Sequence, residues 1–194
     1  MGAAAPAPPP ALNRTPLAGN DNDMLSVACN NETHNGTAGT PCAGYQSLLE
    51  QRGQFALWCI QASPLILGHD VRTMGPEARA IITNPDMIKL NQDPLGHRGA
   101  IVYQSDPVNR TLTTFVKKLA DPSSPRAAAL FNRGETAATM TLTREQMGFD
   151  SACASVTLTD LDTHKVVASA VKGATLYSAS LQPHEVRTVR AKCA

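Results

Sequence analysis

Residues 55–96 decide the fold of this chain, and they run FALWCIQASPLILGHDVRTMGPEARAIITNPDMIKLNQDPLG. Apolar residues recur at helical spacings from Phe55 to Ala62, which predicts a helix. A short apolar strand at 65–67 follows, then polar residues, and Pro76 opens a second helix. Helix, buried strand, polar residues at the carboxyl end of the strand, and helix again are typical of an α/β barrel, whose chemistry lies at these strand ends. The stretch therefore indicates an enzyme.

The pattern changes along the chain in a way that predicts two kinds of structure. Helices are predicted at 45–61, interrupted by Gly53, at 76–83 and at 84–90, the last with Asn84 as N-cap and Pro85 at its first position. From about residue 97 short segments alternate apolar and polar residues between turns, which predicts an antiparallel β-sandwich. Its strands are predicted at 101–103, 111–116, 127–131, 137–142, 155–161, 165–170, 174–180 and 185–191.

These segments give a fold class of α/β followed by all-β. We divide the chain into a disordered Pro/Ala-rich lead-in at 1–18, a partial (β/α)8 barrel of about two β/α units at 19–96, and a β-sandwich at 97–194. The whole chain has 194 residues, which is short for a complete barrel of about 200 residues at the least.

Composition excludes several classes of partner. The formal net charge is +1, so nothing electrostatic points to nucleic acid. No apolar run approaches the ~20 residues of a membrane span, and the N-terminus lacks the features of a signal peptide. Phosphate-binding, dinucleotide-binding and G-x-S-x-G motifs are absent, and the histidines show no metal-ligand spacing. We expect no cofactor and no metal, and we form no expectation about the oligomer.

The five cysteines leave several pairings open. Cys29 and Cys42 flank a polar loop and either close it as a disulfide or stay reduced. Cys153 and Cys193 are placed to tie the C-terminal region together, while Cys59 lies on an apolar helix face and is expected to be a buried free thiol.

Four N-x-S/T triplets favour a secretory history for the chain. They begin at Asn13, Asn31, Asn35 and Asn109.

Two carboxylates stand in NDNDML, after a predicted strand end. Asp21 and Asp23 either bind sugar hydroxyls, hold a metal or cap a turn, and Asn-Asp clusters favour the turn. On an extended segment their side chains point to opposite sides, so they make a poor acid/base pair. If one of them faces a substrate, Asp23 with Met24 is our choice.

Asp70 and Arg72 follow the apolar strand in GHDVR. They either contact a sugar or support a site at the barrel mouth, or they form a buried ion pair or a helix cap, and this structural interpretation is at least as strong.

The motifs together resemble glycoside hydrolase family 27, the α-galactosidases and α-N-acetylgalactosaminidases. Four ordered blocks carry the resemblance over residues 19–149: NDNDML, FALWCIQASPLILGHDVRTM, NPDMIKLNQDPLG and ALFNRGETAAT. The family typically has W-N-D-P-D-M-L at the first block, where this chain has Gly19 and Asn22 in place of Trp and Pro.

The resemblance implies a (β/α)8 barrel followed by an antiparallel β-domain, in retaining exo-glycosidases that remove terminal α-galactosyl residues. The family's nucleophile and acid/base are aspartates on earlier barrel strands, so we expect this chain to be a C-terminal fragment with no catalytic residue and no hydrolytic activity alone. Asp23 and Met24 carry over as substrate-binding residues, and Asp21, Asp70 and Arg72 as their support.

The intact family enzyme would take an α-galactoside and be secreted, vacuolar or lysosomal. The alternative is a non-catalytic module that binds galactosides or a partner chain.

Overall fold

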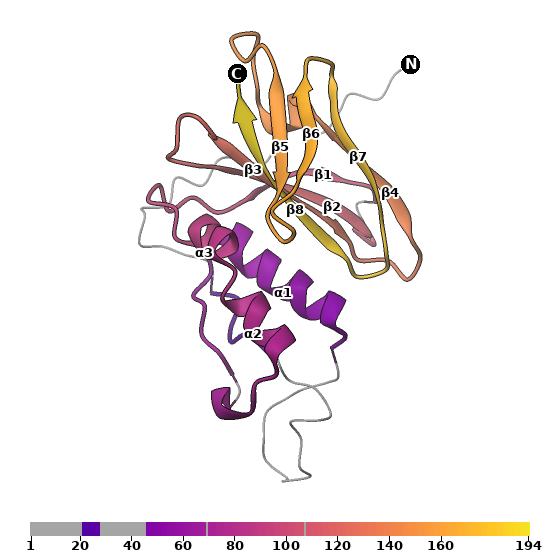
Figure 1. The fold of residues 1–194 in the computed structure, drawn as a ribbon. Coiled ribbons are helices and arrows are strands. Elements are labelled where there is room, and N and C mark those ends of the chain that lie inside the picture. The colour runs from indigo at the N-terminus through magenta and orange to yellow at the C-terminus, as the bar shows by residue number, and fades with distance from the viewer. Residues whose placement is uncertain (1–20, 28–45, 69, 107) are drawn as a thin grey trace.

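The computed structural model of the protein describes residues 21–27, 46–68, 70–106 and 108–194. A helical part comes first and a strand-rich part follows (Figure 1). The helices are α1 (Leu48–Gln61), the 3-10 helix η1 (Val71–Thr73), α2 (Pro76–Ile82), α3 (Pro85–Asn91) and the short α4 (Arg144–Met147). The strands are β1 (Ala100–Gln104), β2 (Leu112–Lys118), β3 (Arg126–Asn132), β4 (Ala138–Thr143), β5 (Val156–Asp160), β6 (Val166–Val171), β7 (Thr175–Leu181) and β8 (Val186–Cys193).

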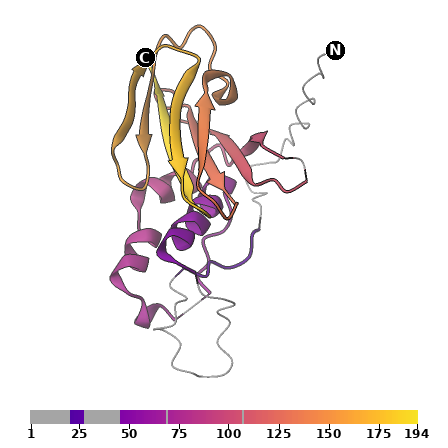
Figure 2. The same ribbon diagram turned by 90° about the vertical axis from the view of Figure 1, so that its right-hand side faces the viewer.

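The strands form two antiparallel sheets, and this confirms the predicted β-sandwich. The large sheet has the order β1-β2-β3-β8-β5-β6, and β4 pairs with β7 in the small one. Figure 2 shows α1, α2 and α3 gathered on one side of these strands. The large sheet therefore has the helices against one face and the small sheet against the other.

Strict alternation along β3 produces two hydrophobic cores, one on each face of the large sheet. Ala127 and Ala129 pack with Phe55 and Ile60 of α1. Ala128 and Leu130 pack toward the small sheet, with Leu142 among their neighbours. Small side chains on β3 allow α1 to lie close to the sheet.

The helix ends follow local sequence signals. Ser47 caps α1 in a capping box with Glu50, and Asn84 caps α3 by accepting from the amides of Asp86 and Met87. The predicted N-cap Asn84 and the following Pro85 are both observed. We expected Gly53 to interrupt the first helix, but α1 runs through it, because Gly53 packs against the turn between β7 and β8.

The NQDPLG segment joins the helices to the sheet. The Asn91 side-chain amide donates to the carbonyl oxygen of Trp58, in the last turn of α1, at 3.3 Å and to that of Ser63, just beyond the helix, at 2.8 Å. The Asp93 carboxylate accepts from the backbone amides of Leu95 and Ala120, the second of which follows β2. This segment therefore turns the chain from the helices to the strands, as its sequence predicts.

A buried lysine on β2 completes the contact between helices and sheet. Lys117 is 0% exposed, and its Nζ donates to the carbonyl oxygens of Leu90, Cys59 and Asn91 at 2.6, 3.4 and 3.5 Å. These carbonyls belong to the last turns of α1 and α3, which carry partial negative charge and lack partners within their helices. One ammonium group thus caps two helices.

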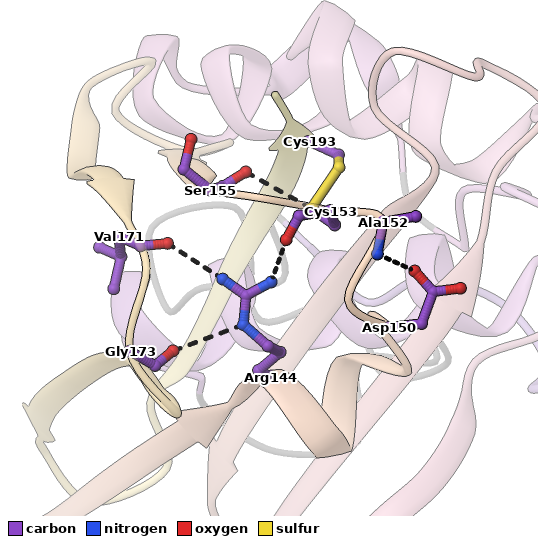
Figure 3. Close-up of a disulfide and its surroundings, with 8 residues drawn as sticks. All are labelled: Arg144, Asp150, Ala152, Cys153, Ser155, Val171, Gly173 and Cys193. Atoms are coloured by element: carbon purple, nitrogen blue, oxygen red, sulfur yellow. Dashed lines mark hydrogen bonds between the residues drawn. A yellow bond between two sulfur atoms is a disulfide. The ribbon is translucent and has the colours of Figure 1, made fainter.

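The disulfide between Cys153 and Cys193 closes the C-terminal end of the sandwich (Figure 3). Their Cα atoms lie 5.5 Å apart and 40 residues apart in sequence. The Arg144 guanidinium donates nearby to the carbonyl oxygens of Cys153 and Val171, at 2.6 and 3.2 Å. The predicted tie at this end is confirmed.

Cys59 is the buried free thiol that we expected, and burial raises its pKa to about 12.

One further expectation turns out differently, and others stay open. The predicted buried strand at 65–67 is reduced to one parallel bridge between Leu25 and Leu67. Ile66 is 57% exposed, because the described residues provide only one neighbouring strand for it. The lead-in at 1–18 and the pair Cys29 and Cys42 lie outside the described residues. The division at residue 97 stays a prediction, since the helices and the large sheet share a core.

Breaking the disulfide should destabilise the sandwich. Closing a loop of this length restricts the unfolded chain and contributes roughly 2–4 kcal/mol. We expect thermal unfolding of the native protein to shift down on adding a reductant, and the shift to shrink in Cys153→Ser. Cys59→Ser is the matched control, because it keeps the disulfide and should keep the full response. An undiminished response in Cys153→Ser would contradict this.

Lys117 should make stability rise with pH in the alkaline range. Burial lowers its pKa from 10.5 to about 8, and the nearby Asp93 charge opposes that shift. Between these two values the unfolded chain binds a proton that the folded chain does not, so the free energy of unfolding increases with pH.

Urea unfolding at pH 7 and pH 10 tests this in the native protein and in Lys117→Met. The stability difference between the two should move in favour of the native protein by about 2–3 kcal/mol over that range. A difference that does not change with pH would refute the assignment.

Candidate functional site

The candidate site forms around the parallel bridge between Leu25 and Leu67. The Leu25 amide donates to the Ile66 carbonyl at 2.7 Å, and the Gly68 amide donates to the Leu25 carbonyl at 2.9 Å. Helix α1 connects the two bridged segments, which makes a β-α-β unit with parallel strands. Asp21, Asp23 and Met24 precede this bridge, and Asp70 and Arg72 follow it.

Two side chains of α1 hold the segment before the bridge. The Trp58 Nε1 donates to the Asp23 carbonyl at 2.9 Å, and the Gln54 Oε1 accepts from both the amide and the hydroxyl of Ser26 at 3.1 Å. Gln54 and Trp58 are four residues apart, so they lie on one face of the helix. The position of Asp23 and Met24 is therefore fixed by α1.

The two aspartates of this segment organise a tight turn. The Asp23 amide donates to Asp21 Oδ1 at 3.0 Å, and the Met24 amide donates to Asp23 Oδ1 at 2.7 Å. Asp23 has a φ of 68°, a left-handed conformation that Asp tolerates better than most residues. This geometry is the turn chemistry that the sequence favoured, and it still leaves both aspartates exposed.

Met24 is 48% exposed and lies against Gly68, where an added Cβ would sit 3.2 Å from the Met24 Cβ. A half-exposed thioether side chain beside an exposed carboxylate offers an apolar contact and a hydrogen-bond acceptor at one place. That pairing suits a ligand with both C–H and hydroxyl groups.

Asp70 and Arg72 form a cap and an ion pair. Asp70 is the N-cap of η1 and accepts from the Arg72 amide at 3.0 Å. The Arg72 guanidinium contacts the same carboxylate, with Nη2 2.6 Å from Oδ2, and this bond raises the pKa of Arg72. The Arg72 side chain is 85% exposed, so the pair is not buried and contributes little to stability. The helix-cap interpretation describes this pair best.

Two cavities lie elsewhere, between the helices and the large sheet. One of about 130 Å³ is lined by Phe55, Asp160 and Thr188, and one of about 380 Å³ by Leu90, Leu119 and Arg190. Neither includes Asp23 or Met24.

The described part of the chain holds no cluster of three His, Cys, Asp or Glu side chains that could bind a metal. None of its helices is long and apolar enough to cross a membrane.

Sequence reasoning missed three residues that shape this region. In the sequence Trp58 fits an apolar helical stripe, and nothing marks Gln54 as its companion. Their four-residue spacing on a predicted helix is the signal that could have paired them. Lys117 interrupts the apolar positions of β2, but nothing local shows that its amine is buried.

The geometry defines a class of protein: the end of an α/β barrel, with polar residues at its strand ends, packed on an antiparallel β-sandwich. The family model "Alpha galactosidase A" matches residues 39–93, and the model "Alpha galactosidase C-terminal beta sandwich domain" matches residues 109–191. These two matches follow the order of the helices and the sandwich.

Known relatives agree with this class. Alpha-galactosidase 3 of Arabidopsis thaliana is 31% identical over 166 residues, which cover 86% of this chain and 33% of that protein. Alpha-N-acetylgalactosaminidase of Rattus norvegicus is 39% identical over 84 residues, or 43% of this chain and 19% of that protein. The crystal structure of alpha-galactosidase I from Mortierella vinacea superposes with a TM-score of 0.68 at 25% identity, covering 89% of this chain and 39% of that one.

The chain belongs to glycoside hydrolase family 27 and matches the C-terminal portion of its members. It spans about a third of the length of the Arabidopsis relative.

Replacing Trp58 should loosen the segment that carries Asp23. Trp58→Phe keeps an aromatic ring but removes the donor to the Asp23 carbonyl, a loss of about 1 kcal/mol. We expect faster amide hydrogen exchange at residues 24–26, with the β-sandwich amides unchanged. Tyr177→Phe, on β7, is the matched control and should leave residues 24–26 unchanged. Equal acceleration throughout the chain, or none at all, would show that Trp58 does not hold this segment.

Proposed function

We propose that this chain supplies the closing wall of the sugar site and the β-sandwich of an α-galactosidase, which hydrolyses terminal α-D-galactosyl residues with retention. Its support is the family membership, together with one observation on the molecule: α1 clamps Asp23 and Met24 at a strand end. A turn held by two side chains of one helix has the rigidity that a sugar-binding position needs.

Each residue of the site has a role in this proposal. The Asp23 carboxylate accepts hydrogen bonds from sugar hydroxyls, and Met24 contacts the C–H face of the same sugar. Asp21 supports the turn through its bond to the Asp23 amide. Asp70 and Arg72 support the loop after the second strand. We assign neither nucleophile nor acid/base to this chain, because retaining hydrolysis needs two carboxyl groups about 5–5.5 Å apart on either side of the bond, and Asp21 and Asp23 both accept from the backbone.

A second function is favoured by the exposed apolar residues at the bridge. Met24 and Ile66 are 48% and 57% exposed beside strand segments that pair only with each other in the described residues. Such edges accept further strands. The chain would then be a non-catalytic module that binds galactosides, or one that binds a separate chain carrying earlier barrel strands.

We place the protein in the secretory pathway, either secreted or in a vacuole or lysosome. The Cys153–Cys193 disulfide supports this location, because disulfides persist in oxidising compartments and are rare in the cytosol.

The purified chain should not hydrolyse a nitrophenyl α-galactoside, since we assign no pair of catalytic carboxylates among the residues that the structure describes. Robust turnover, lost in Asp23→Asn and retained in Asp162→Asn on the β5–β6 turn, would overturn the assignment of roles. Calorimetry with galactose separates the remaining outcomes. Binding without hydrolysis supports the binding module, and copurification with a chain that restores hydrolysis supports assembly from two chains.

A further inference from the structure

The hairpin formed by β1 and β2 carries an exposed apolar edge. β1 ends the large sheet, and among the described residues it pairs only with β2. Ile101, Val102 and Tyr103 on this strand are 42%, 38% and 41% exposed, and Val108 in the turn is 83% exposed. The free edge of an apolar strand is a template for pairing with another chain, and proteins protect such edges with charge, β-bulges or covering segments. β1 has one of these devices, a register shift between Ile101 and Tyr103 in its pairing with β2. β1 itself carries no charged residue.

A modification sequence lies in the turn of the same hairpin. Asn109, Arg110 and Thr111 form an N-x-T triplet between β1 and β2, with Asn109 exposed. Asp106 accepts from the Val108 amide at 2.8 Å and from Asn109 Nδ2 at 2.7 Å. The side-chain amide of the acceptor is therefore held by a hydrogen bond at an exposed position.

The surroundings of the acceptor leave it available for modification. The Asn109 side-chain amide donates to one carboxylate oxygen of Asp106, and Asn109 is next in sequence to the 83%-exposed Val108. The Thr111 hydroxyl lies 3.0 Å from the Ser105 hydroxyl at the base of the turn. The disulfide at the other end of the sandwich is itself typical of the oxidising compartments in which such triplets are modified.

We propose that Asn109 carries an N-linked glycan, which shields the open edge of β1. In the transfer, Asn109 Nδ2 bonds to the anomeric carbon of an oligosaccharide delivered as a lipid pyrophosphate. The bond from that carbon to the pyrophosphate oxygen breaks, the pyrophosphate leaves with the electron pair, and one amide proton is lost to base. The second amide proton remains on Nδ2, so the bond to Asp106 can persist. A bulky hydrophilic chain on Asn109 would lie next to Val108 and would cover the edge of β1 that does not pair with β2.

Occupancy is tested by peptide mass spectrometry on the protein isolated from its own cells, and on the full chain sent through a eukaryotic secretory pathway behind a cleavable signal peptide. The peptide containing Asn109 should carry a glycan, and treatment with peptide N-glycosidase should leave Asp at that position. Asn109→Gln and Thr111→Ala should lose this glycan, while the matched variant Thr111→Ser keeps the triplet and should retain it. An unmodified Asn109 overturns the proposal, whether or not Asn13, Asn31 and Asn35 are occupied.

Shielding is tested by light scattering at equal concentrations of Asn109→Gln and Thr111→Ser. The variant without the glycan should aggregate more, and adding Val102→Lys to it should reverse the increase by placing a charge on the strand edge. Equal scattering from the two single variants would refute the shielding role. A discrete dimer of Asn109→Gln in place of open aggregation would show that β1 is an interface between copies, which also refutes it.

Discussion

The ammonium group of Lys117 holds the helices to the large sheet. It comes from a β-strand, is sealed from solvent, and donates to carbonyl oxygens at the ends of α1 and α3. Without this group the buried Leu90 carbonyl would lose its 2.6 Å donor, at a cost of ~1–3 kcal/mol, whereas the Cys59 carbonyl also accepts from the Ala62 amide at 3.3 Å. Helix α1 in turn holds the turn at Asp23 through Trp58 and Gln54. The placement of the candidate sugar-binding residues therefore depends on the helix whose end Lys117 binds.

Much of the fold follows from local sequence, because its signals are local. Asn84 and Pro85 start a helix where their chemistry predicts it, and all eight predicted strands are present within a few residues. The pairing of β3 with β8 is not predictable in this way, since these strands are about 55 residues apart and alternation specifies a face but no partner. The same limit applies to Lys117, whose position on β2 gives its face but not the helix ends it meets.

The candidate site, too, can be predicted from local sequence only in part. The turn at Asp21 and Asp23 was predicted from residue type, and their hydrogen bonds confirm that geometry. The clamp from α1 joins residues 35 positions apart, and no local pattern contains such a contact. Family resemblance supplies the roles of Asp23 and Met24, whereas the physical pattern alone describes a capped turn beside an exposed thioether. Chemical roles in a barrel depend on strands that meet at one end, and the described residues contribute to such an end two short segments joined by one parallel bridge.

Gly99 gives the connection between helices and sheet a particular mechanical character. Its amide donates to the Ile60 carbonyl at 2.8 Å, and an added Cβ would lie 2.9 Å from Ile60 Cγ1 and 3.4 Å from Phe115 Cβ. The chain thus crosses from one part to the other while touching both, with space for no side chain. Hinges need a few residues that are free to change their backbone angles, and Gly99 is not free in this way because it packs against both parts. At this residue we therefore expect the helices and the large sheet to move together.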